Sequence, residues 1–159
     1  MKKLLLIRHA KAGSHDMTDF ERPLTDSGIR DAELMARQLQ KAGLIPQYVL
    51  TSAALRTQAT ANIIAQTLNI THQTADKSIY EAGMRTLLQI INDLPAEYNF
   101  IALVGHNPGI SNILYELSGE VRDIPPAGMA LIEFDIDEWE LVYSGTGKLS
   151  WYDSPEGYP

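Results

Sequence analysis

The sequence predicts an α/β fold, with a mostly parallel central β-sheet of about six strands and helices on both faces. Short apolar runs alternate with longer amphipathic runs along the chain, which is typical of buried strands connected by helices. The 159 residues suffice for one domain with a sizeable core, and cysteine is absent. We therefore expect a single domain over residues 1–159 that folds without disulfides or a structural metal.

Strands are assigned where apolar residues run together, and helices where they recur at helical spacing. The first strand, Leu4 to Ile7, is apolar throughout, as expected for a strand covered on both faces. The expected order is strand 4–7, helix 25–42, strand 48–50, helix 55–68, a short third strand closed by residues 79–80, helix 84–94, strand 100–104, helix 109–117, and late strands at 129–136, 140–144 and 149–152.

Helix boundaries are marked by capping and breaking residues. Thr25, Asp26 and Ser27 are cap candidates at the start of the first helix, and Gly43 follows its end. Pro95 stops the third helix. These signals support an alternation of strands and helices, in which ligands bind beyond the carboxyl ends of the strands.

Composition narrows the function classes. The net charge of −7 argues against general nucleic-acid binding, because an acidic chain repels phosphate backbones. The apolar run after Lys3 is ended by Arg8, so it is too short for a signal peptide, and no stretch approaches the roughly 20 apolar residues of a membrane span. We expect a cytoplasmic protein with no membrane or nucleic-acid partner.

Polar side chains follow three of the predicted strands. The first strand leads into Arg8 and His9, the second into Ser52 with Arg56 one helical turn later, and the fourth into His106. Each of these residues alone has an ordinary structural explanation, such as a hydrogen-bonded histidine or a solvated arginine. Since parallel strands end at one edge of a sheet, the coincidence of two arginines and two histidines predicts a shared anion-binding cavity.

Four segments, in this order, resemble the signatures of the histidine phosphatase superfamily. They are residues 4–10 (a strand followed by Arg-His and then Ala10 where the family has Gly), 22–28 (Arg-Pro-Leu-Thr-Asp-Ser-Gly), 51–60 (Thr-Ser-Ala-Ala-Leu-Arg-Thr-Gln-Ala-Thr) and 104–109 (Val-Gly-His-Asn-Pro-Gly). The resemblance runs from residue 4 to about residue 115. It implies the phosphoglycerate mutase-like fold, and the later strands fit this topology without a motif.

Within the superfamily, the chain is most similar to the compact phosphohistidine phosphatases of the SixA type. The stretch between Tyr80 and Phe100 has length for one helix and no room for the lid insertion of related sugar-phosphate enzymes. Ala10 replaces the usual glycine, and its methyl group is acceptable unless this position needs a positive φ.

The resemblance implies that His9 attacks phosphorus and becomes a phosphohistidine, which water then hydrolyses. Imidazole is nucleophilic only when neutral, and nearby guanidinium groups disfavour its protonation. Arg8 and Arg56 suit the phosphoryl oxygens through paired donors, and His106 is expected to donate to an equatorial oxygen. The other ring nitrogen of His9 needs a fixed acceptor for its proton, which the sequence does not identify.

Three further residues are candidates for the same site. Ser52 and Asn107 are expected to bind phosphate, although the Ser52 hydroxyl suits a helix N-cap equally well. Glu81, after the predicted third strand, suits both the general acid that the resemblance places in this region and an ordinary helix cap. No cofactor and no metal ligand set is implied, because HExxH and clustered ligand spacings are absent.

These observations predict a metal-independent phosphatase, most simply a protein phosphohistidine phosphatase acting on a phosphorylated protein. The nearest alternative is a small-molecule phosphomonoesterase on the same scaffold, with a small phosphorylated substrate. A metal hydrolase and a non-catalytic phosphate-binding module are the other classes considered. The oligomeric state stays open.

Overall fold

A six-stranded mixed sheet, mostly parallel, forms the centre of the molecule in the computed structural model, which describes residues 1–13 and 18–158. The strand order is β3-β2-β4-β1-β5-β6. The strands are β1 (Lys2–Arg8), β2 (Tyr48–Ser52), β3 (Gln73–Asp76), β4 (Phe100–Gly105), β5 (Met129–Phe134) and β6 (Gly147–Asp153), and the helices are α1 (Asp26–Ala42), α2 (Leu55–Leu68), α3 (Met84–Asn92) and α4 (Gly109–Ser118).

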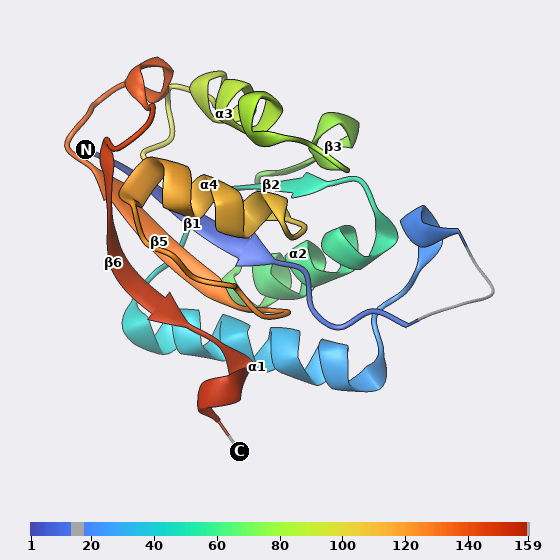
Figure 1. Cartoon of the computed structure of the whole chain (residues 1–159). Helices are drawn as coiled ribbons and strands as arrows, with labels where there is room; N and C mark the ends of the chain where they lie inside the picture. The colour runs from blue at the N-terminus through green and yellow to red at the C-terminus, as the bar shows by residue number, and fades with distance from the viewer. Residues whose placement is uncertain (14–17, 159) are drawn as a thin grey trace.

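Helices cover both faces of the sheet, as predicted, with α1 and α2 on one face and α3 and α4 on the other (Figure 1). Successive residues of β1 point to opposite faces, so the run that reads as continuously apolar contributes to two separate cores. Leu5 and Ile7 pack with the α1 and α2 side of the sheet, while Leu4 and Leu6 pack with the α3 and α4 side. The burial of all four side chains explains why the alternation of a half-exposed strand is missing there.

The parallel strands β3, β2, β4 and β1 end at one edge of the sheet, whereas β5 runs antiparallel to β1 and β6 antiparallel to β5. The register pairs Arg8 at the end of β1 with Gly105 at the end of β4, and Ser52 at the end of β2 with Asp76 at the end of β3. This edge therefore receives the residues that follow each parallel strand.

Two predicted strands are wrong. Residues 79–80 belong to a 3-10 turn at Lys77–Ile79 and the residue after it, and the third strand lies earlier, at Gln73–Asp76. The residues of β3 are mostly exposed at the edge of the sheet, so they lack an apolar signature. The predicted strand at 140–144 is replaced by a 3-10 turn at Trp139–Leu141. The buried side chains of Ile79 and Trp139 account for the apolar character of both turns.

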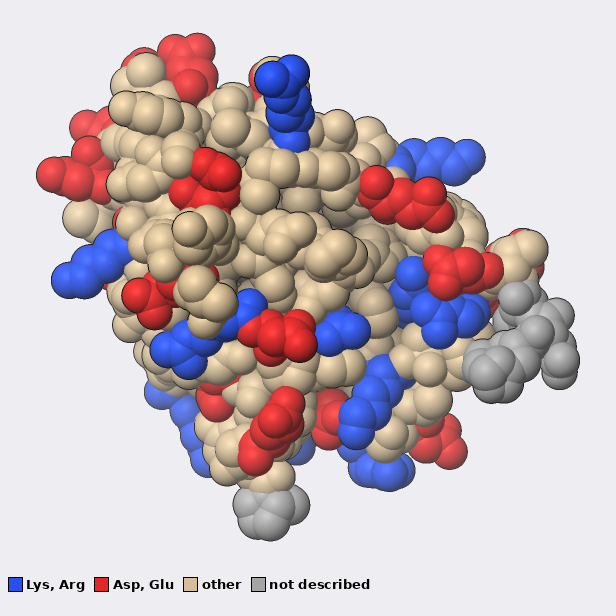
Figure 2. Space-filling model, in the orientation of Figure 1, with Lys and Arg blue, Asp and Glu red and all other residues tan. Residues whose placement is uncertain are grey.

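Charged side chains of both signs are interspersed over the face that Figure 2 shows. No basic surface dominates this view, in keeping with the net charge of −7. In the part of the chain that the structure describes, no helix is both long and apolar enough to cross a membrane.

Candidate active site

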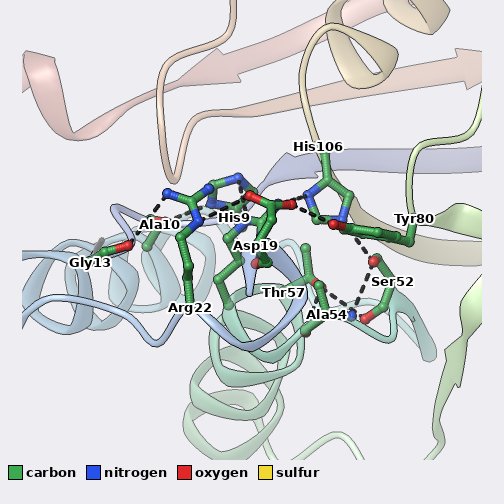
Figure 3. Close-up of polar contacts among 11 residues, drawn as sticks. His9, Ala10, Gly13, Asp19, Arg22, Ser52, Ala54, Thr57, Tyr80 and His106 are labelled. Carbon is green, nitrogen blue, oxygen red and sulfur yellow. Dashed lines mark hydrogen bonds and ion pairs between the residues drawn. The ribbon is translucent and has the colours of Figure 1, made fainter. Parts of the chain in front are cut away.

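A cavity of about 810 Å³ lies at the carboxyl edge of the parallel strands. Its lining includes Arg8, His9, Arg56 and His106, the four residues that the strand-end pattern predicts to converge. The rings of His9 and His106 lie 5.3 Å apart between centroids and are tilted by 58°. Figure 3 shows both rings pointing toward the same region, one from the end of β1 and the other from the end of β4.

The hydrogen bonds of His9 assign its tautomer. Nδ1 lies 2.7 Å from the carbonyl oxygen of Ala10, which can only accept, so Nδ1 carries the proton. Nε2 lies 3.3 Å from Arg56 Nε, which can only donate, so Nε2 keeps its lone pair. The backbone carbonyl of Ala10 is thus the fixed acceptor that the sequence could not identify.

The surroundings of His9 keep its ring neutral. Burial lowers the pKa of His9 to about 4, against the hydrogen bond to Ala10, and the positive charges of Arg56, Arg8 and Arg22 act in the same direction as burial. The side chain is not sealed off, because His9 retains 9% of its exposure and lines the cavity. His9 therefore presents a neutral, accessible nitrogen at neutral pH.

Ala10 fits its position without backbone strain. Its φ is not positive, because the described non-glycine residues with positive φ are Asn69, Glu81 and Ala127. Ala10 is fully buried, and its N–H donates to Thr60 Oγ1 at 3.0 Å. The alanine that departs from the family pattern is accommodated by this packing.

Arg56 forms hydrogen bonds with both histidines of the site and with Asp19. Its Nε–H donates to His9, one Nη2–H meets His106 Nδ1 at 3.3 Å, another Nη2–H meets Asp19 Oδ2 at 3.1 Å, and Nη1–H donates to Asp19 O at 2.6 Å. Only 5% of the residue is exposed, so these contacts fix the guanidinium plane.

Replacing Arg56 by Lys keeps the charge and removes the planar fork. A single ammonium cannot reach His9, His106 and a phosphoryl group together, so we expect the turnover rate to fall by about tenfold or more. Steady-state kinetics with the best substrate checks this. Arg30→Lys, an exposed change on α1, is the control and should leave the rate unchanged. Equal rates for Arg56→Lys and the wild type would show that the planar set of guanidinium donors is not needed.

Arg8 carries an unused donor. Its Nη1 donates to the carbonyl of Ile124 at 2.9 Å, while its buried Nε has no hydrogen-bond partner in the described chain. Burial lowers the pKa of Arg8, although Asp123 opposes this effect. Arg8 also lines the cavity, so its positive charge lies where an anion would bind. The loop before β5 fixes this end of β1, because Ala127 N–H donates to the carbonyls of both Arg8 and His9 at 3.1 Å.

Ser52 supports His106 and does not line the cavity. Its Oγ lies 2.7 Å from His106 Nε2 and accepts from the N–H of Ala54 at 3.3 Å, and the residue is fully buried. The N-cap of α2 is Ala54, so Ser52 is not the cap either.

The pKa of His106 lies well below that of an ordinary histidine. Burial, followed by the charge of Arg56, lowers the pKa of His106 to about 3, and a bound dianion would raise it again.

Asn107 lines the cavity, but its side-chain atoms have structural partners. Nδ2 donates to Asp123 and to the carbonyl of Ile124, while Oδ1 accepts from both the N–H and the hydroxyl of Ser111. These bonds tie the start of α4 to the loop that also holds Arg8. Phosphate binding by the Asn107 side chain stays a prediction, and this arrangement gives it a positioning role.

Glu81 is exposed on the cavity wall and has a φ of 59°. It follows a 3-10 turn and Tyr80, and not a strand as the sequence suggested. A non-glycine residue in the left-handed region is uncommon, and such residues cluster at functional sites. The backbone therefore places this carboxyl group beside the cavity, where the acid role stays a prediction.

Three residues at the site were missed as functional candidates. The Asp19 carboxylate accepts from Arg22 Nε at 3.1 Å and from the hydroxyl of Tyr80, in addition to Arg56. Arg22 lies in the second family-like segment, which was a usable signal. Asp19 and Tyr80 are brought in by tertiary contacts alone, and the Tyr80 ring packs edge-on against His106 with 5.5 Å between centroids.

Comparison with solved structures supports the fold. A SixA protein from Nakamurella multipartitia matches with a TM-score of 0.85 at 25% identity, covering 97% of this chain and 96% of that one. The protein histidine phosphatase SixA in complex with tungstate matches with a TM-score of 0.81 at 23% identity, covering 98% of each chain. The second likeness, at this low identity, supports the fold alone.

Sequence comparison supports the family. An uncharacterised chloroplastic protein of Arabidopsis thaliana is 26% identical over 162 residues, covering 94% of this chain and 74% of that protein. The family model of the histidine phosphatase superfamily (branch 1) matches residues 4–86, which include Arg8, His9 and Arg56. With this match over more than half of its length, the chain belongs to branch 1 of the histidine phosphatase superfamily.

Proposed function

We propose that the protein is a phosphohistidine phosphatase that removes a phosphoryl group from a protein through a covalent intermediate at His9. The observation that carries this proposal is the orientation of His9, whose Nδ1 proton is held by Ala10 while the unprotonated Nε2 accepts from Arg56 Nε–H. The likeness to the SixA protein from Nakamurella multipartitia, described as a putative phosphohistidine phosphatase, supports the choice of phosphohistidine as substrate.

The reaction balances in two steps. The Nε2 lone pair of His9 forms a bond to phosphorus as the N–P bond of the substrate breaks, and the leaving imidazole takes a proton from the cavity or from water. Water then attacks the phosphorus on His9, which releases inorganic phosphate and restores the neutral ring. Imidazole, with a pKa near 6.5, accepts a proton readily at neutral pH, so this leaving group needs little acid catalysis.

The arginines and His106 suit the charge that accumulates in transfer. Arg8 lines the cavity with its positive charge, and Arg56 can exchange its present acceptors for phosphoryl oxygens. A dianion beside His106 favours its protonation, after which Nδ1 can donate to an equatorial oxygen. These groups are already fixed by the fold, so little reorganisation accompanies the reaction.

A small-molecule phosphomonoesterase is the second candidate. The cavity of about 810 Å³ is large enough for a small phosphorylated ligand, and Glu81 on its wall could protonate an alkoxide leaving group. An alkoxide needs an acid far more than imidazole does, so Glu81 separates the two candidates.

The test compares turnover of a phosphohistidine-bearing protein with turnover of phosphoserine and sugar-phosphate esters. We expect phosphohistidine to be the better substrate, without loss of activity in EDTA. The described residues include no group of three or more His, Asp or Glu side chains placed to hold a metal ion. Hydrolysis of one small ester with no action on phosphohistidine would favour the second candidate, and rescue of an EDTA-treated enzyme by a divalent ion would overturn the metal-free mechanism.

Glu81→Gln should affect the two substrate classes differently. If Glu81 is the acid for esters, the amide should slow ester hydrolysis by about tenfold or more and leave phosphohistidine hydrolysis nearly unchanged. The ratio of kcat/KM for the two substrates is the measurement. An equal loss on both would show that Glu81 positions water or supports the wall.

The proposed setting is the cytoplasm, with a phosphorylated protein as the partner and no nucleic acid. The interspersed charges in Figure 2 support recognition through the local arginine cluster over attraction by the whole surface. Fractionation of cells that express the tagged protein would test the compartment.

A further inference from the structure

The Asp19 carboxylate lies against the arginines of the cavity. Figure 3 shows Asp19 between Arg22 and Tyr80. Oδ1 accepts from Arg22 Nε, while Oδ2 accepts from Arg56 Nη2 and from the hydroxyl of Tyr80. The side chain nevertheless keeps 54% of its exposure and lines the cavity, so it can leave this position without unfolding anything.

Arg56 has few donors left for a substrate. A guanidinium carries five N–H groups. In this site Nε–H meets His9, one Nη1–H meets the Asp19 carbonyl, and the two Nη2–H groups meet the Asp19 carboxylate and His106, which leaves one. A phosphoryl group that binds Arg56 through paired donors must therefore replace at least one of these acceptors.

We propose that Asp19 is an internal anion that competes with the phosphoryl group for Arg22 and Arg56 and so sets the anion affinity of the site. This inference rests on the proposed function only in placing a phosphoryl group on Arg56. Of the acceptors on Arg56, the carboxylate is the charged one, and it is exposed enough to turn toward water. The two histidines are held by Ala10 and Ser52 on their opposite ring nitrogens, so they are the harder acceptors to displace.

The charge of Asp19 is maintained by the same contacts. The hydrogen bond from Tyr80, followed by the charges and donors of Arg56 and Arg22, lowers the pKa of Asp19. A dianionic phosphoryl group offers more charge to the arginines than one carboxylate, so it wins the competition where a monoanion does not. Asp19 thereby favours dianions and eases release of the product.

The test measures binding of inorganic phosphate and of tungstate by calorimetry, which needs no turnover. Asp19→Asn keeps the shape of the side chain and removes the charge, so phosphate should bind about tenfold more tightly. Tyr80→Phe removes one donor to Asp19 and keeps its charge, and it should also tighten binding, by about threefold. Thermal melting verifies that both variants are folded.

Glu21→Gln is the matched control. Glu21 lies in the same 3-10 turn as Asp19, is exposed, and contacts neither arginine in the described ion pairs. The substitution therefore removes the same charge as Asp19→Asn without removing a contact to the arginines. We expect phosphate affinity within about twofold of the wild type. Weaker binding in Asp19→Asn, or binding equal to that of Glu21→Gln, would overturn the inference and assign Asp19 to holding the arginines in place.

The two proposals fail separately. Tighter anion binding in Asp19→Asn with no hydrolysis of phosphohistidine by the wild type would support the internal anion and reject the proposed function. Hydrolysis by the wild type with no tightening in either variant would do the reverse.

Discussion

His9→Ala should lose at least about 10³-fold in turnover, which corresponds to roughly 4 kcal/mol of activation free energy. The reason is geometric as well as chemical. Ala10 holds the Nδ1 proton, burial keeps the ring neutral, and Nε2 faces the cavity beside Arg56. Neither the methyl group of alanine nor a water molecule in its place can form the covalent intermediate, so only slow direct hydrolysis on the arginines would remain.

The measurement combines single-turnover kinetics with trapping of labelled phosphate on the protein. The wild type should carry label that is labile in acid and stable in base, as a phosphoramidate is, and His9→Ala should carry none. His72→Ala is the control, because His72 is exposed just before β3. It lies at the amino ends of the parallel strands, whereas the cavity lies at their carboxyl ends. Near-normal turnover by His9→Ala, or label that survives acid, would reject His9 as the nucleophile.

The residues at strand ends were predictable because their place follows from local signals. Arg8, His9 and His106 directly follow apolar runs, and the rule that parallel strands end together brings them to one edge. Arg56 follows a strand closely within a family-like segment. The structure brings all four to one cavity, while their catalytic roles stay predictions.

Contacts that depend on tertiary packing were not predictable in the same way. Asp19 and Tyr80 are 61 positions apart in the sequence, and nothing in their neighbourhoods indicates that they form a hydrogen bond. The partner of Ser52 was not predictable for a related reason, because its hydroxyl at the end of β2 lies against His106, which follows β4 and is 54 positions later in the sequence.

Edge elements show the limit of apolar periodicity. β3 is built from exposed polar residues, and its place is set by pairing with β2, which the pattern of its own side chains does not reveal. Ile79 and Trp139 are buried within 3-10 turns, so the sequence there contains apolar residues that resemble those of a short strand. The predicted fold class is nevertheless confirmed, because it depends on the buried central strands.

Gly28→Ala should destabilise the protein by about 3 kcal/mol and impair the site with it. Gly28 lies in the first turn of α1, where a Cβ atom would meet the carbonyl oxygen of Lys11 at 2.2 Å and its backbone C and N at 3.1 Å. No rotamer relieves a clash with backbone, so the helix and the segment after His9 would have to separate. Thr25 joins the same two segments, since its N–H donates to the Lys11 carbonyl at 2.9 Å.

This direction opposes helix propensity, which makes the test informative. In an exposed helix, Gly→Ala stabilises by roughly 1 kcal/mol, so a net loss can only come from the contact with Lys11. Gly43→Ala, at the other end of α1, is the matched control: it has nothing within 4 Å, and its φ of 70° predicts a cost of about 1 kcal/mol with unchanged turnover. Denaturant unfolding measures both variants, and a Gly28→Ala protein as stable as the wild type would contradict the close approach. Because Lys11 follows His9 and Ala10 directly, the glycine of the second family-like segment lets α1 pack against the backbone that follows His9.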